Sequence, residues 1–226
     1  MLSEAADPIK VEVIPNGVDT DFFRRRAKAD ERIFTFLFVG RFHAQKNLPF
    51  LLDAMAALRR DVLIPFRVAI VGDGPMASDL RRRCTALGLD DVVTWYGWCN
   101  KEQLLAHYQA ADCFINPSIY EGMPNTVLEA MACSLPVVAS AVPGNDEVVV
   151  PGETGFLFPV DDLWQFVAAM RRLLVDPPLV RVMGETGRIE VATTFSWQNA
   201  ARKYVRLLVG TSMSSPDSAK PVNGTR

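Results

Sequence analysis

Histidine is scarce in this chain, which has two histidines and four cysteines among 226 residues. The cysteines are scattered and form no CxxC pair, so the sequence gives no support to a zinc site. We therefore expect no metal centre. We expect reduced, mostly buried thiols in a cytoplasmic protein, at Cys84, Cys99, Cys113 and Cys133.

Strong charge of one sign and long apolar runs are also lacking. The formal net charge is −2, so no basic field covers the molecule, and nucleic acid is excluded as the main partner. Charged residues interrupt every apolar run before it reaches the length needed to cross a bilayer. Residues 1–10 lack the apolar centre of a signal peptide.

The composition is that of one globular domain, with 49% hydrophobic and 22% charged residues. We assign this domain to residues 11–210 and treat residues 1–10 as a remnant or linker. Residues 211–226 are rich in Ser, Pro, Lys and Gly and lack an apolar period, so we expect a disordered tail.

Strand-like and helix-like patterns alternate from residue 33 onward. The predicted strands are 33–39, 67–71, 92–96, 113–116, 136–139 and 155–158, and the predicted helices are 48–58, 76–87, 101–109, 126–133, 163–174, 179–192 and 197–208. Short apolar strands separated by helices predict an α/β fold with a doubly wound parallel sheet, Rossmann-like. Such folds bind ligands in the loops at the carboxyl ends of their strands.

The loop after the first strand combines a glycine with two cations. Gly40 allows a sharp turn, and Arg41 and Lys46 come just before a predicted helix. Two cations beside a helix N-terminus form an anion site. The alternative, that both are solvated surface residues, stays open for this loop alone.

The loop after the second strand imitates a dinucleotide-binding motif. Gly72-x-Gly74-x-x-Ala77 follows a strand and opens a helix, as in the NAD fingerprint. The loop follows the second strand instead of the first, and its acidic pair Asp90-Asp91 is misplaced for that role. We favour a tight strand-to-helix turn that lines the ligand cleft.

The loop after the fourth strand is the most informative. Gly122 lets the backbone approach a ligand, and Asn125 is predicted to cap the next helix, so that the N–H groups of Thr126 and Val127 point outward. Glu121 and Glu129 bracket this anion site, and a carboxylate can accept two hydrogen bonds from neighbouring hydroxyls.

A site of this kind would bind a phosphate group flanked by two polyols, and a nucleotide sugar has this chemical structure. Two carboxylates could also be a glycoside hydrolase acid/base pair, but that chemistry needs no phosphate site between them. Individually, Glu121 and Glu129 could be ordinary surface carboxylates; their arrangement around a helix start favours the nucleotide sugar.

In this order, the motifs resemble the family 4 retaining glycosyltransferases of the GT-B group. The resemblance covers about residues 11–208, and its motifs are Ile14-Pro15-Asn16-Gly17-Val18-Asp19, Gly40-Arg41 with Lys46-Asn47, Gly72-Asp73-Gly74-Pro75, the Glu121-x7-Glu129 element, Glu129-Ala130-Met131-Ala132-Cys133 running into Leu135-Pro136-Val137, Gly152-x-x-Gly155 and Phe195-Ser196-Trp197. It implies that the chain is the C-terminal, donor-binding half of a GT-B fold.

The resemblance also implies roles for individual residues. Arg41 and Lys46 would hold the donor diphosphate, Glu129 the ribose, and Glu121 the hydroxyls of the transferred sugar. Backbone N–H groups for sugar and phosphate would come from Gly122, Met123, Asn125 and Thr126. Trp98 would lie near the base. Two departures are Ser134, where Gly is usual, and the Met-Pro-Asn sequence after Gly122, which leaves the identity of the sugar open.

The expected reaction is retaining transfer of a sugar from a nucleoside diphosphate to an acceptor hydroxyl. The family's N-terminal acceptor domain is missing from this sequence, so we expect a fragment or one half of a split enzyme, inactive alone. Any peripheral membrane contact would come through that absent domain. No cofactor and no divalent metal would be required, because cations and N–H donors already face the diphosphate. The alternatives are a non-catalytic nucleotide-sugar-binding subunit and a related GT-B enzyme such as an epimerase; a phosphorylase would need a pyridoxal lysine, for which the sequence offers no context.

Overall fold

A computed structural model describes residues 13–25 and 33–209. The predictions for residues 1–10 and 211–226 lie outside these residues. The described part contains a six-stranded sheet in the order β3-β2-β1-β4-β5-β6, and every neighbouring pair is parallel. Its strands are β1 (Phe34–Val39), β2 (Phe66–Val71), β3 (Val93–Gly97), β4 (Cys113–Asn116), β5 (Val137–Ser140) and β6 (Gly155–Phe158).

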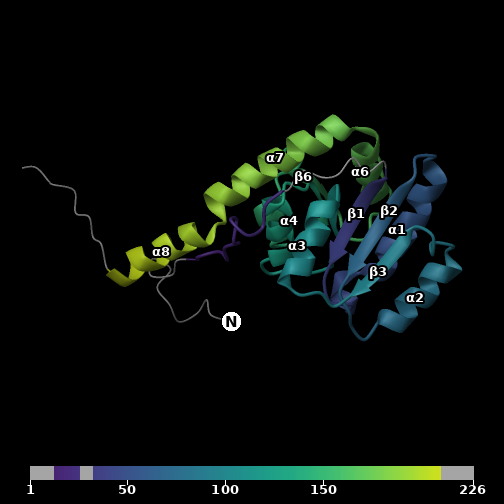
Figure 1. Ribbon diagram of the computed structural model, residues 1–226, viewed down its shortest axis with the longest axis horizontal. Helices are drawn as coiled ribbons and strands as arrows, with labels where there is room; N and C mark the ends of the chain where they lie inside the picture. The colour runs from purple at the N-terminus through teal and green to yellow at the C-terminus, as the bar shows by residue number, and fades with distance from the viewer. Residues whose placement is uncertain (1–12, 26–32, 210–226) are drawn as a thin grey trace, which may run out of the picture.

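Helices cover both faces of this sheet (Figure 1). One apolar core lies between the sheet and α1, α2 and α6, and a second lies between the sheet and α3, α4 and α7. The helical elements are η2 (Ala44–Lys46), α1 (Leu48–Asp61), α2 (Ala77–Ala86), α3 (Lys101–Ala110), α4 (Asn125–Ala132), α5 (Asn145–Val148), α6 (Leu163–Val175), α7 (Pro177–Thr194) and α8 (Trp197–Val209). The predicted doubly wound α/β fold is confirmed.

β1 shows why the strands read as continuous apolar runs. Phe36 and Phe38 pack on the side of α1, whereas Leu37 and Val39 pack on the side of α4. Phe36, Leu37 and Phe38 are at most 1% exposed. A strand buried on both faces loses the apolar–polar alternation of a half-exposed strand. Truncating one of these phenylalanines to Ala would cost about 3–5 kcal/mol.

The strand order reverses between β1 and β4, which are neighbours in the sheet although β2 and β3 come between them in the chain. Loops leaving two such strands diverge to opposite faces and open a crevice at their carboxyl ends. Two hydrogen bonds connect the loops here. The Ile119 N–H donates to the Gln45 carbonyl at 2.9 Å, and Gln45 Nε2 donates to the Tyr120 carbonyl at 2.8 Å.

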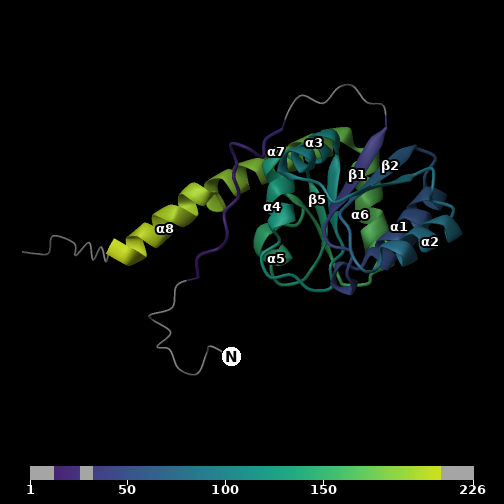
Figure 2. The same ribbon diagram turned by 60° about the horizontal axis from the view of Figure 1, so that its bottom comes forward.

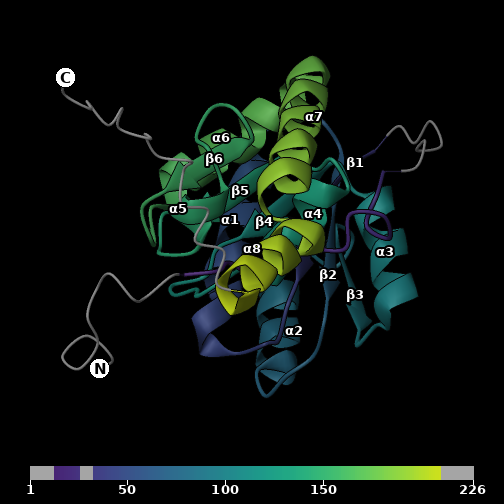
Figure 3. The same ribbon diagram turned by 90° about the vertical axis from the view of Figure 1, so that its left-hand side faces the viewer.

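α8 continues from α7 and projects away from the sheet (Figure 2). The view along the molecule shows α7 passing α4, against which it packs, before α8 leaves the body of the domain (Figure 3). Among the described residues, no helix combines the length and apolar character needed to cross a membrane.

The predicted elements match within two residues at each end, except α1, which continues three residues beyond its predicted end. Two short elements, η2 and α5, were not predicted. The predicted N-cap of α4 is wrong, because Pro124 occupies that position and Asn125 is the first helical residue. The backbone explains this: the Pro124 carbonyl accepts from the Val127 N–H at 2.9 Å, while the Asn125 side chain accepts from Asn16 Nδ2. The cysteines are free thiols in the described part, as predicted, with Cys99 only partly buried.

Candidate functional site

An ion pair joins the two loops that leave β1 and β4. Lys46 Nζ lies 2.5 Å from Glu121 Oε1, with 20% and 8% of their side chains exposed. Lys46 is placed there by η2, whose last residue it is, and Asn47 follows in the left-handed conformation at φ 51°. The sequence predicted a cation in one loop and a carboxylate in the other. The crevice brings them into direct contact.

Glycines allow the loop after β2 to touch the loop after β1. A Cβ on Gly72 would lie 2.0 Å from the Gly40 carbonyl oxygen, and one on Gly74 would lie 2.5 Å from that of Phe42. Gly72 also has a φ of 133°, which favours glycine. The Gly-x-Gly sequence therefore allows two loops to pack tightly, which the expected strand-to-helix turn did not foresee.

A pocket of about 370 Å³ opens between these loops and α3. Its lining includes Gly40, Arg41 and Gly72 on one side and Trp98, Cys99 and Leu104 on the other. Arg41 is exposed, and Trp98 is 79% exposed. Four of the predicted donor-site residues thus share one pocket, which we call the Trp98 pocket.

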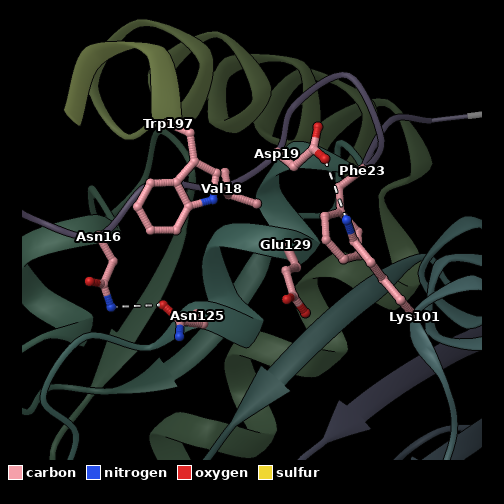
Figure 4. Close-up of a pocket in the computed structure, with 9 residues that line it drawn as sticks. Asn16, Val18, Asp19, Phe23, Lys101, Asn125, Glu129 and Trp197 are labelled. Carbon is pink, nitrogen blue, oxygen red and sulfur yellow. Dashed lines mark hydrogen bonds and ion pairs between the residues drawn. The ribbon is translucent and has the colours of Figure 1, made fainter. Parts of the chain in front are cut away.

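A second pocket has a volume of about 290 Å³ (Figure 4). Asn125 and Glu129 line it from α4, Asn16 and Asp19 from the N-terminal loop, Lys101 from the start of α3 and Trp197 from the start of α8. We call it the Glu129 pocket. Because Lys101 and Leu104 are neighbours on α3, the two pockets flank the first turn of the same helix.

Glu129 is partly buried, and its Oε2 accepts a hydrogen bond of 2.8 Å from the hydroxyl of the fully buried Tyr108. Burial raises the pKa of Glu129 above its ordinary value, and the bond from Tyr108 and the charge of Lys101 partly oppose this shift. The carboxyl group is therefore held by the core while still lining a pocket. This is the arrangement of a fixed hydrogen-bond acceptor.

The remaining predicted residues lie around the start of α4. Gly122 has open space where a side chain would be, since no described atom lies within 4 Å of that position. The Asn125 N–H donates to the Met123 carbonyl at 3.0 Å. Of the two N–H groups expected to point outward, that of Val127 is used within the turn, whereas that of Thr126 has no acceptor in the described part of the chain.

Several residues of this region carried no predicted role. Asp19, which begins the Asp-x-Asp sequence 19–21, accepts from the Phe22 N–H at 3.0 Å and pairs with Lys101 at 3.4 Å. The Phe22 hydrogen bond is the main cause of its lowered pKa. Trp197 is distant in sequence from everything else in the Glu129 pocket. Only the resemblance motifs, which contain Asp19 and Trp197, signalled their importance.

Comparison of this chain with protein families adds to the geometry of the site. The model of the family described as glycosyl transferases group 1 matches residues 19–190. The chain belongs to this family. Over 202 residues it is 33% identical to the UDP-Gal:alpha-D-GlcNAc-diphosphoundecaprenol alpha-1,3-galactosyltransferase of Escherichia coli, covering 84% of this chain and 51% of that protein.

Solved structures agree with this membership. Sucrose-phosphate synthase from Thermosynechococcus elongatus is 33% identical, with a TM-score of 0.79 over 88% of this chain and 52% of that one. The C-terminal domain of a glycosyl transferase group 1 family protein from Francisella tularensis has a TM-score of 0.71 at 23% identity, over 80% of this chain and 100% of that chain. The chain spans about half the length of the curated relative it matches, and its fold is that of the C-terminal half of a GT-B glycosyltransferase.

Within this glycosyltransferase domain, the departure at Ser134 has a backbone explanation. Ser134 adopts a φ of 59°, in the left-handed region where glycine is unstrained. A Cβ on Gly184 would lie 2.1 Å from the Ser134 carbonyl oxygen. The residue that follows α4 therefore shapes the packing of α4 against α7, away from both pockets.

Proposed function

We propose that this glycosyltransferase domain binds a nucleoside diphosphate sugar across the crevice between β1 and β4. We propose further that it is the donor half of an enzyme that transfers the sugar to an acceptor hydroxyl with retention of configuration. The observation that carries the proposal is the Lys46–Glu121 pair beside the start of α4. The pair joins a cation that can bind a diphosphate to a carboxylate that can accept hydrogen bonds from sugar hydroxyls. A nucleotide sugar requires both groups.

Each part of the donor would meet a matching group. The base would enter the Trp98 pocket, whose indole offers an exposed aromatic face. The ribose hydroxyls would donate to Glu129, which Tyr108 holds in place. The diphosphate would lie between Arg41 and Lys46, and the sugar would meet Glu121.

In the reaction, negative charge develops on the departing diphosphate. Arg41, Lys46 and the free N–H of Thr126 would stabilise that charge without reorganising, which is the largest contribution in many enzymes. Lys46 has three donor hydrogens, so it can contact a phosphate oxygen while it keeps Glu121 in place. With these groups present, we propose that donor binding needs no divalent metal.

The two carboxylates provide the test of this proposal. Calorimetric titrations would compare UDP with UDP-galactose and GDP with GDP-mannose. Glu129→Ala should weaken both members of a pair equally, because both contain the ribose. Glu121→Ala should weaken only the sugar-bearing member. If Glu121→Ala weakens a bare nucleotide as strongly as Glu129→Ala does, the two ends of the site are wrongly assigned.

Transfer itself should require an acceptor-binding partner. Holding two reactants in place supplies on the order of 7–11 kcal/mol of a barrier. The purified chain would be incubated with its best nucleotide sugar and a mixture of sugar and lipid acceptors, with and without the N-terminal domain of a relative, and products followed by mass spectrometry. Acceptor turnover by the chain alone at about 1 per second or faster would contradict the half-enzyme assignment.

A further inference from the structure

A chain of buried polar side chains lies directly behind Glu121. It consists of Asn116 at the end of β4, Ser118 in the loop that follows, Ser140 at the end of β5 and Asn145 at the start of α5. Asn116 is 3% exposed, and the other three are fully buried. Four polar side chains in an apolar interior are costly unless their hydrogen bonds are complete, so their role needs an explanation.

Each hydrogen bond in this cluster has a defined donor and acceptor. Ser140 Oγ donates to the Ser118 carbonyl at 2.6 Å, and Ser118 Oγ donates to Asn116 Oδ1 at 2.6 Å. Asn145 Nδ2 donates to the Ser140 carbonyl at 3.0 Å, which turns its Oδ1 toward Asn116. Every buried side-chain nitrogen and oxygen in the described part of the chain has a partner.

These bonds determine which way the Asn116 amide faces. Its Nδ2 donates to Asn145 Oδ1 at 3.1 Å and to Glu121 Oε1 at 3.3 Å. The opposite orientation would turn Oδ1 toward two acceptor oxygens and would turn the amide NH2 group toward the Ser118 hydroxyl. The fold therefore aims a fixed N–H donor at one oxygen of Glu121.

The two oxygens of Glu121 consequently differ. Oε1 receives both Lys46 and Asn116. Oε2 has no hydrogen-bond partner among the described residues and, unlike a buried atom, keeps contact with solvent. Since Oε1 is held from two sides, the carboxylate orientation is restrained, and Oε2 is the oxygen left available to a ligand.

We propose that Asn116 is a positioning residue: held by Ser118 and Asn145, it locks Glu121 so that Oε2 accepts from the sugar hydroxyls of the donor. The inference rests on the proposed function and assigns a task to residues that do not touch the ligand. It predicts that Asn116, and through it Ser118 and Asn145, contributes to recognition of the sugar and not of the nucleotide.

The test measures Kd by calorimetry for UDP and UDP-galactose, and for GDP and GDP-mannose, in Asn116→Ala. Affinity for the better nucleotide sugar should fall about tenfold, while affinity for its bare nucleotide should change less than about twofold. Ser140→Ala is the matched control, because it removes a hydroxyl from the same cluster that donates only to backbone carbonyls. It should leave the ratio of the two affinities unchanged.

A double-mutant cycle with Glu121→Gln shows whether Asn116 acts through Glu121. In the Glu121→Gln background, Asn116→Ala should cause no further loss of sugar discrimination; additive losses would overturn the proposal. Equal losses for the sugar-bearing and bare ligands would also overturn it while leaving the proposed function intact. If Asn116→Ala does not fold, Ser118→Ala, which frees Asn116 Oδ1, replaces it with the same expectation in weaker form. A wild-type chain that binds neither nucleotide would refute the proposed function itself.

Discussion

Lys46→Ala separates stability from ligand binding at the predicted diphosphate site. The Lys46–Glu121 pair is intermediate between a surface pair and a buried one, with 20% and 8% of the side chains exposed. An exposed pair contributes about 0–1 kcal/mol, whereas breaking a buried pair costs about 3–5 kcal/mol. We therefore expect Lys46→Ala to lower the free energy of unfolding by about 2 kcal/mol, mainly because the partly buried Glu121 carboxylate loses its cationic partner and keeps, among the described residues, the Asn116 amide as its hydrogen-bond donor.

The same substitution removes one charge-assisted contact to the diphosphate. Such a contact contributes about 1.5–3 kcal/mol, so the Kd for UDP or GDP should rise by about one to two decades. Uncharged nucleosides should bind almost as before. Calorimetry gives the Kd values, and urea unfolding gives the stabilities.

Two further variants make this experiment decisive. Lys46→Ala combined with Glu121→Gln should recover stability, since no uncompensated carboxylate remains, but should not recover affinity for the bare nucleotide. Arg83→Ala breaks an ion pair with Asp53 outside the site, where the side chains are 45% and 38% exposed, and should alter neither property by much. If Lys46→Ala weakens uridine and UDP equally, Lys46 supports the fold and does not contact the phosphate.

Three other predictions concern metal, pH and backbone conformation. UDP or GDP should bind in the presence of EDTA, because the protein supplies the cations; calorimetric heat that appears only after magnesium is added would contradict this. Burial raises the pKa of Glu129, so the folded chain binds the proton of this carboxyl group more tightly than the unfolded chain does. Protonation of Glu129 therefore stabilises the folded chain, and this contribution is complete below the ordinary pKa of 4.5. The contribution is lost as pH rises through the raised pKa. In urea titrations from pH 4.5 upward, the wild type should therefore lose stability relative to Glu129→Gln. Parallel pH profiles of the two proteins would contradict this prediction. Gly144→Ala should destabilise by about 2–4 kcal/mol and weaken nucleotide-sugar binding, because its φ is 87° and its Cβ would lie 1.8 Å from the Gly122 carbonyl oxygen. Gly88→Ala has a φ of 67° with no described atom within 4 Å, so it should show the backbone cost of about 1 kcal/mol alone in thermal unfolding; equal losses for the two variants would argue against the steric contact.

The loops of the site were identifiable from sequence because they follow recognisable strands. Gly40 and Gly122 each come after an apolar run, and parallel strands put their carboxyl ends at one edge of the sheet. The cap of α4 was predicted wrongly, since Asn125 has the side chain of a good N-cap but follows a proline that takes the cap position. The conformation of the preceding loop therefore outweighed the N-cap preference of Asn125.

Side chains far apart in sequence could not be paired in advance. No motif linked Asn116, at the end of β4, with Ser140, at the end of β5, or with Asn145, at the start of α5. Their hydrogen bonds arise because β4 and β5 are neighbours in the sheet. Tyr108, which holds Glu129, gave no signal either, because an aromatic residue on a helix is most often part of the core.

The sequence alone determined the doubly wound α/β class, through apolar runs and helical periods that depend on near neighbours, and the family, through motifs kept in order. The tertiary structure alone decided that Lys46 meets Glu121, that Glu129 is raised in pKa by burial, and that a set of buried hydrogen bonds restrains the Glu121 carboxylate. Periodicity reports which face of an element is buried, but contacts between loops depend on strand order and helix packing. Those are settled only when the whole core assembles.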